Sequence, residues 1–192
     1  MNATQTRKLA VADIDVSAVV EKAAAFGFRL ASPVELAAGV AMAESLMGSQ
    51  IASPEAIARM NRITGMTAWV TGSPVEGIFL TLPLTPEGEG AVRDGTYSPG
   101  EPDEAHLAHQ GKNLAAFYIG VYAGATRQAR KNIMMACAIL RVEMFGAFPA
   151  YARAATEDGR RSMESLGFSR FEGGLPDLYM QPAFRELSEK AA

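Results

Sequence analysis

The sequence predicts an α/β (α+β) domain, in which helices flank a central sheet. Two serine–proline pairs, Ser32-Pro33 and Ser53-Pro54, are typical of an N-cap followed by a first helical residue, and each opens an Ala-rich stretch. Runs of β-branched and aromatic residues at 66–71 and 76–84 then indicate a hairpin, because Gly72-Ser73-Pro74 separates them. Strand and helix patterns alternate after residue 114, which favours a sheet covered by helices.

Each element follows from a local pattern. Amphipathic spacing predicts the helices, apolar or β-branched runs predict the strands, and glycines such as Gly167 end an element. In chain order we expect a helix at 16–26, a strand at 27–31, helices at 34–47 and 54–62, strands at 66–71 and 76–84, a strand at 115–122, a helix at 127–145, a strand at 151–155, a helix at 157–166, and strands at 168–171 and 178–180.

The composition excludes several classes of protein. The chain has 192 residues, 48% of them hydrophobic, which suits a single domain, 1–192, with 1–27 as an N-terminal helical extension. A net charge of −3 argues against a nucleic-acid-binding protein. The longest apolar stretch, 114–125, is too short to span a membrane, and the polar N-terminus shows no secretory signal, so we expect a cytoplasmic protein. A single cysteine, Cys137, excludes an internal disulfide and is most simply a core residue.

Residues 86–113 form an acidic insertion rich in glycine and proline. Its 28 positions hold three prolines, five glycines and six acidic residues against two basic ones. Such a segment is typical of a functional lid or of a disordered insertion. As a lid, its negative charge would attract a cationic substrate. A solvated loop or a dimer contact is the alternative.

The strongest local signal for chemistry is a strand, a sharp turn and a helix that opens on basic residues. Arg127, Arg130 and Lys131 lie in the first turns of that helix. Unpaired N–H groups and the positive end of the dipole make a helix N-terminus an anion site, so this pattern predicts a phosphate or pyrophosphate cradle. A solvated basic face is the equally weighted alternative.

The region 117–168 resembles the GNAT superfamily of N-acetyltransferases. Phe117-Tyr-Ile-Gly-Val-Tyr-Ala-Gly-Ala-Thr-Arg127 is similar to the fourth strand and pyrophosphate loop of that family, and Met-Glu-Ser-Leu-Gly-Phe168 is similar to its closing helix and Gly-Phe pair. The resemblance implies a mixed sheet with helices on both faces, which splays between the fourth and fifth strands to admit acetyl-CoA or another acyl-CoA. The cofactor-binding residues that it implies are Val121, Tyr122, Ala123, Arg127, Gln128, Ala129, Arg130, Lys131, Asn132 and Thr156.

This sequence departs from the family pattern in the loop, in the closing helix and in the fourth strand, where Ala116 and Tyr118 stand in place of a frequent carboxylate base. Arg130 and Asn132 stand where the family has small residues, and Met163 stands where a tyrosine general acid is frequent. We therefore assign the catalytic roles to His109 and Tyr118, the first as a proton carrier and the second as a polar group on the central strand. By simple alternation, Tyr118 and Tyr122 are expected on one face of that strand. Alternatively, His109 is only an exposed loop residue, and Tyr118 and Tyr122 only pack against their neighbours.

The function that the resemblance implies is an acyl-CoA-dependent N-acyltransferase. Acetyl transfer to a small amine or an amino-acid-like acceptor would proceed by direct attack of the amine on the thioester. The alternative is a catalytically silent GNAT-like module that binds acyl-CoA or a protein. We expect no metal, no nucleic acid and no membrane partner, and a homodimer is compatible with the sequence.

Overall fold

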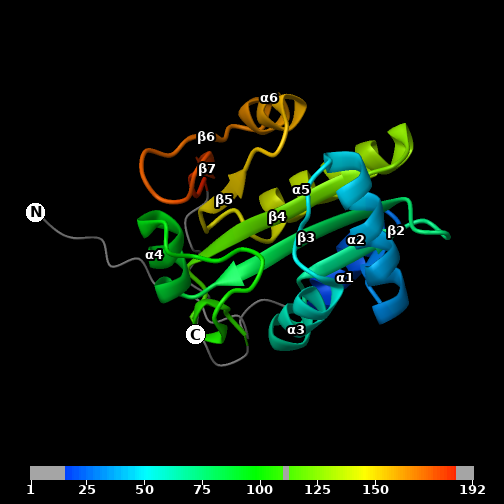
Figure 1. The fold of residues 1–192 in the computed structure, drawn as a ribbon, viewed down its shortest axis with the longest axis horizontal. Coiled ribbons are helices and arrows are strands. Elements are labelled where there is room, and N and C mark those ends of the chain that lie inside the picture. Colours follow the sequence, from blue (N-terminus) through cyan, green and yellow to red (C-terminus); the bar gives the residue numbers. More distant parts are fainter. Residues whose placement is uncertain (1–15, 110–112, 185–192) are drawn as a thin grey trace, which may run out of the picture.

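A computed structural model describes residues 16–109 and 113–184 (Figure 1). Most of its elements begin and end within a few residues of the predicted bounds. Their order is α1 (Val16–Ala24), β1 (Phe28–Leu30), α2 (Pro33–Met47), α3 (Pro54–Thr64), β2 (Ala68–Thr71), β3 (Gly77–Leu84), α4 (Pro86–Asp94), the short 3-10 helix η2 (Glu104–His106), β4 (Ala116–Gly124), α5 (Arg127–Glu143), β5 (Ala150–Arg153), α6 (Glu157–Ser165), β6 (Ser169–Arg170) and β7 (Leu178–Gln181).

The helix starts follow the capping signals in the sequence. The Ser32 side chain accepts the Glu35 N–H and the Ser53 side chain accepts the Ala56 N–H, and each serine is followed by a proline in the first turn. Both helices end at a glycine in the left-handed conformation, where a side chain would be strained.

The described strands form a seven-stranded mixed sheet of order β1-β2-β3-β4-β5-β7-β6. The pair β4–β5 is parallel, and the other neighbouring pairs are antiparallel. Helices cover both faces, as the successive residues of β3 show. Phe79 packs in the cluster that contains Ile133 of α5, whereas Ile78 packs in the cluster that contains Val40 of α2. The predicted mixed sheet between two helical layers is confirmed (Figure 1).

The parallel pair β4–β5 separates halfway along β4. Pairing runs from Phe117↔Ala150 to Ile119↔Ala152 and does not continue, although β4 extends to Gly124. The half of β4 beyond Ile119 is therefore paired with β3 on one edge and faces a gap on the other, which we call the β4–β5 gap. This is the splay that the resemblance predicted.

A bulge in β4 changes which face each later side chain occupies. Leu80 pairs with Val121 but Thr81 pairs with Ile119, so Gly120 is an extra residue without an opposite partner. Tyr118 consequently packs with Tyr97 and Tyr151, on the face covered by α3 and α4, while Tyr122 packs on the α5 face. The expectation that the two tyrosines share a face is wrong, because it assumed an unbroken alternation.

The described part of the insertion, 86–109 and 113, includes α4 and η2, so the alternative of a disordered insertion is wrong there. Thr85 caps α4 by accepting the Gly88 N–H, and Pro86 occupies the first turn. The segment also adds buried side chains to the sheet, among them Val92, Tyr97 and Leu107. Leu107 forms a bridge to Leu84 of β3. The remaining positions of the insertion, 110–112, lie outside the described residues.

Candidate functional site

The β4–β5 gap exposes backbone donors of β4. The Ala125 N–H donates to the Glu76 carbonyl across the β3 side of the strand, at 2.8 Å. Because backbone direction alternates along a strand, the N–H groups of Ala123 and Val121 also point to β3, and those of Gly124 and Tyr122 point into the gap. Of the predicted residues Val121, Tyr122 and Ala123, only Tyr122 therefore offers its backbone to a molecule in the gap.

The N-terminus of α5 lies directly beyond this part of β4. The Thr126 side chain caps the helix by accepting the Ala129 N–H at 3.0 Å, and no acidic residue stands in the first turn. Arg127, Gln128, Arg130 and Lys131 are exposed, whereas Ala129 is buried. Cations oppose the helix dipole at this end, so a bound anion would relieve their repulsion. The structure thus brings five of the predicted residues to one helix end.

Arg130 has a structural role as well as a charge. Its guanidinium Nη1 donates to the Gly124 carbonyl at 3.1 Å, which ties the first turn of α5 to the end of β4. A side chain at Gly124 would place its Cβ 2.8 Å from the Arg130 backbone nitrogen. Gly124 is therefore needed for this close approach. Asn132 is similarly engaged, since its Oδ1 accepts from Gln128 Nε2 at 2.7 Å.

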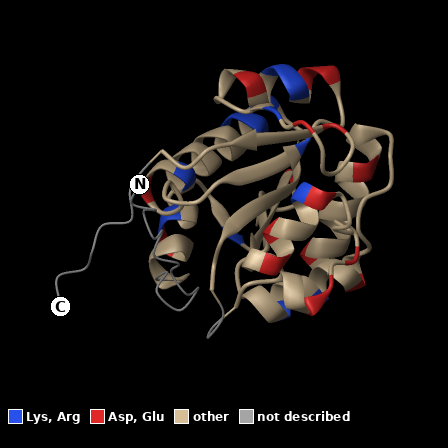
Figure 2. Cartoon of the chain, turned by 90° about the vertical axis from the view of Figure 1, so that its left-hand side faces the viewer, with Lys and Arg blue, Asp and Glu red and all other residues tan. Residues whose placement is uncertain are grey.

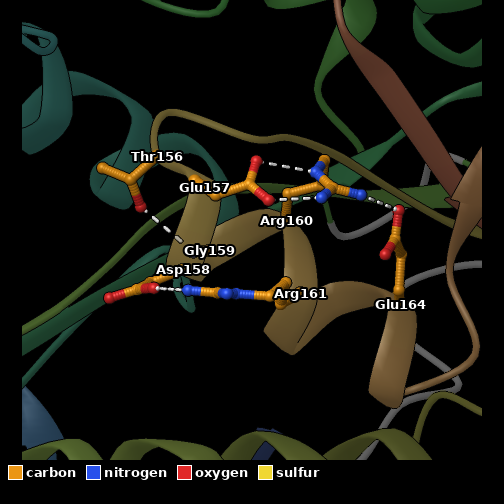
Figure 3. A network of polar contacts seen from close by, with 7 residues as sticks. All are labelled: Thr156, Glu157, Asp158, Gly159, Arg160, Arg161 and Glu164. Carbon is orange, nitrogen blue, oxygen red and sulfur yellow. Dashed lines mark hydrogen bonds and ion pairs between the residues drawn. The ribbon is translucent and has the colours of Figure 1, made fainter.

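Helix α6 begins beside the end of β5, and its arginines are paired within the helix. Thr156 is its N-cap and accepts the Gly159 N–H at 3.0 Å. Arg160 bonds to Glu157 and Glu164, and Arg161 pairs with Asp158 (Figure 3). Helix α6, at the top of Figure 2, accordingly carries adjacent basic and acidic residues. Local pairing leaves the α5 end as the less compensated cationic site.

A small cavity lies behind β4 on the α5 face. It has a volume of about 30 Å³, and its lining includes Ile119, Tyr122, Cys137, Arg141 and Ala150. Tyr122 and Cys137 form a side-chain hydrogen bond, and burial raises the pKa of the Cys137 thiol to about 12. A thiol with so high a pKa is protonated at neutral pH, so Cys137 is not a nucleophile here.

Tyr118 lies on the other face, in a cluster of aromatic and polar side chains under α4. Its ring centroid is 5.3 Å from that of Tyr97, which in turn is 5.8 Å from the His106 ring. Burial raises the pKa of Tyr118 to about 12, and the positive charge of Arg153 opposes that rise. Tyr151, opposite Tyr118 on β5, donates its hydroxyl to Glu89 at 2.9 Å.

Two buried polar atoms in this cluster have no hydrogen-bond partner among the described residues, the Tyr97 hydroxyl and His106 Nδ1. A buried hydroxyl without a partner destabilises a fold by about 1–3 kcal/mol. We therefore expect Tyr97→Phe to leave the free energy of unfolding unchanged or to raise it, measured by urea denaturation. Tyr118→Phe is the matched control on the same face. A loss of more than about 1 kcal/mol in Tyr97→Phe would contradict the assignment of an unpaired hydroxyl.

His109 lies near the start of β4 and not near its diverging half. The neighbouring Ala108 donates its N–H to the Pro83 carbonyl at 2.9 Å, and Leu84 pairs with Ala116 at the beginning of β4. From Ala116 to Gly120 a strand rises by roughly 13 Å. The structure thus places Tyr118 closer along the strand to the gap than His109, and the catalytic role of either residue stays a prediction.

The described residues contain neither a membrane-spanning helix nor a cluster of metal-ligating side chains. None of the helices in 16–109 and 113–184 has the length and apolarity needed to cross a bilayer. Within the same ranges, no three His, Cys, Asp or Glu side chains gather in a way that would hold a metal ion.

Three residues of the site were not singled out from the sequence. Gly120 makes the bulge, Gly124 permits the contact with Arg130, and Arg153 ends β5 at the gap. A glycine within an apolar strand is itself a signal for a bulge, so Gly120 could have been found. Arg153 had no such signal, because its position at the gap depends on where β5 stops pairing with β4.

Comparison with known proteins gives structural similarities only. No protein-family model and no curated protein sequence matches the chain. Ard1 from Thermoplasma volcanium is similar at 10% identity and a TM-score of 0.48, over 82% of this chain and 97% of that one. A GNAT-family acetyltransferase from Streptococcus agalactiae is similar at 13% identity and a TM-score of 0.49, over 82% and 95%.

A third similar structure is GphF, a GNAT-like decarboxylase in complex with isobutyryl-CoA. It matches at 17% identity and a TM-score of 0.42, over 73% of this chain and 72% of that one. At these identities and TM-scores, the similarities do not extend to the activity of the site. The mixed sheet, the two helical layers and the separation of β4 from β5 in this chain are the fold features that the sequence resemblance implied.

Proposed function

We propose that the chain is an acyl-CoA-dependent N-acyltransferase that binds its acyl donor in the β4–β5 gap. One observation carries this proposal: pairing of β4 with β5 stops at Ile119, and the free edge of β4 leads directly into the cationic N-terminus of α5. A pantetheine arm is a chain of amides that needs strand-like hydrogen bonds, and a diphosphate needs N–H groups and cations. The gap and the helix end supply both in that order.

In the proposed reaction, an unprotonated amine attacks the thioester carbonyl carbon. The C–N bond forms, the C–S bond breaks, the amine nitrogen releases one proton to the solvent and CoA leaves as the thiolate. The N–H groups of Tyr122 and Gly124 hold the donor along β4, and Arg127 and Lys131 neutralise the diphosphate. The small cavity beside Ile119 suits a short acyl group, because a volume of about 30 Å³ has room for only two or three water-sized groups.

Met163 supports a second candidate, a GNAT-like module that binds acyl-CoA without turnover. Met163 packs against the cluster that contains Ala150 and Ala152, together with Ile119, and so reaches the mouth of the gap from α6. A thioether cannot protonate a leaving thiolate. In the catalytic case the thiolate leaves unassisted from this side, and slow turnover is expected.

The two candidates separate in one experiment. Purified protein is incubated with acetyl-CoA or octanoyl-CoA and a panel of small amines and amino acids, and free CoA thiol and acylated product are quantified by mass spectrometry. If the chain is a transferase, acylated product should form from acetyl-CoA, and less product should form from octanoyl-CoA. Binding of acetyl-CoA without product would support the silent module. No binding of either donor at millimolar concentration would contradict both.

A further inference from the structure

We propose that Arg153 binds the carboxylate of the acceptor, so that the acceptor class is an amino acid or another amine that carries a carboxylate. The inference rests on the proposed function and deepens it, because the resemblance alone left a simple amine and an amino-acid-like acceptor open. It assigns substrate recognition to a residue that the sequence did not single out.

Arg153 lies at the point where β5 leaves β4. It is the last residue of β5, one position beyond Ala152, at which pairing with β4 ends. By alternation its side chain is on the same face as that of Tyr151, which packs with Val92 of α4 and Tyr118 of β4. Arg153 therefore lies at the mouth of the gap on the α4 side, opposite the face that α5 covers.

In this proposal, the two sides of the gap bind different molecules. On the α5 side, the cationic helix end is the proposed diphosphate site. On the α4 side, a second molecule has to reach the thioester without displacing the donor. A cation at that mouth is thus separated by the sheet from the proposed diphosphate site, and it suits an anionic group of the acceptor.

The guanidinium of Arg153 is held in place by the backbone and not by an acid. Its Nε donates to the Pro176 carbonyl at 2.7 Å, and the side chain is exposed. None of the ion pairs between described residues involves Arg153, whereas Arg29, Arg160 and Arg161 each pair with a carboxylate. Anchoring through Nε leaves the two Nη groups to bind a carboxylate as a fork.

Tyr118 is the neighbour that connects Arg153 to the gap. Arg153 lies close enough to oppose the increase in the pKa of the Tyr118 hydroxyl that burial causes. The hydroxyl belongs to β4, one residue before Ile119, where the strands separate. A carboxylate on Arg153 would therefore hold its amine over the start of the gap.

The test compares matched acceptors in wild type, Arg153→Ala and Arg153→Lys. The probes are the common amino acids and the corresponding amino-acid amides, which retain the amine and lack the carboxylate. We expect wild type to favour the acids, and Arg153→Ala to lower kcat/KM for the acids by roughly 10- to 100-fold, the value of a charge-assisted hydrogen bond. Turnover of the amides and the Kd for acetyl-CoA should change less than twofold. Arg153→Lys should recover part of the loss.

Binding measured by calorimetry keeps this proposal separate from the proposed function. If acetyl-CoA does not bind, the proposed function fails, while binding of an amino acid that Arg153→Ala abolishes would still support a carboxylate site. Equal use of acids and amides by wild type would overturn the proposal, as would no binding or acylation of any acid in the panel. An Arg153→Ala variant that loses acetyl-CoA binding would place the residue in the donor site instead. Arg62→Ala, an exposed arginine on α3, is the matched control.

Discussion

Reversal of two charges at the start of α5, Arg127→Glu with Lys131→Glu, is expected to weaken acetyl-CoA binding by at least 100-fold, or about 2.7 kcal/mol. Both side chains are exposed in the first turns of a helix that has no acidic residue there. The change removes two cations from the proposed diphosphate site and adds two repelling anions. Isothermal titration calorimetry at low ionic strength measures the loss.

The same variant should be no less stable than wild type when no donor is bound. Glutamate near a helix N-terminus interacts favourably with the dipole, by about 0.3–1 kcal/mol, whereas the native cations oppose it. Stability and binding are thus expected to move in opposite directions. Arg62→Glu on α3 makes one such charge change at a distance and should leave binding intact. Unchanged affinity in the double variant would remove α5 from the donor site.

Gly88→Ala is expected to destabilise the protein by roughly 3 kcal/mol, at the upper end of the cost of overpacking. A Cβ at Gly88 would lie 2.2 Å from the His106 carbonyl oxygen and 3.0 Å from two further backbone atoms of that residue. Neither segment can yield easily, because Thr85 donates its N–H to the same carbonyl at 3.0 Å. The melting temperature should fall by roughly 6–12 °C.

Gly90→Ala is the matched control in the same helix. A Cβ at Gly90 would meet nothing within 4 Å, so the substitution should stabilise α4 by about 0.5–1 kcal/mol through the higher helix propensity of alanine. The contrast between the two glycines tests whether α4 packs on the 104–106 segment. If the two variants melted alike, the insertion would not be packed as described.

The sequence was informative wherever a signal is local. Ser32 and Ser53 cap their helices as their motifs indicated, and the hairpin of β2 and β3 forms around its breaker. Thr85-Pro86 is the same kind of start signal, yet α4 was not predicted because Gly88 and Gly90 lower the helix propensity of residues 86–94. Tertiary contacts compensate for that cost.

The features that the sequence could not show depend on pairing between distant strands. The bulge at Gly120 moves Tyr122 to the opposite face from Tyr118, and a periodicity of two cannot reveal an inserted residue. The position of Arg153 at the gap is evident only once β5 is known to leave β4 at Ala152. By contrast, the cationic residues of α5 were predictable from their place after a strand and a turn, and the structure brings them together.

Amide chemical shifts and hydrogen exchange, measured by NMR with and without acetyl-CoA, test the central claim most directly. If the donor binds along the free edge of β4, the amides of Tyr122 and Gly124 should shift strongly and become protected from exchange. Those of Val121 and Ala123, which point to β3, should change less. Binding that leaves Tyr122 and Gly124 unprotected, while other amides respond, would contradict a donor site in the β4–β5 gap.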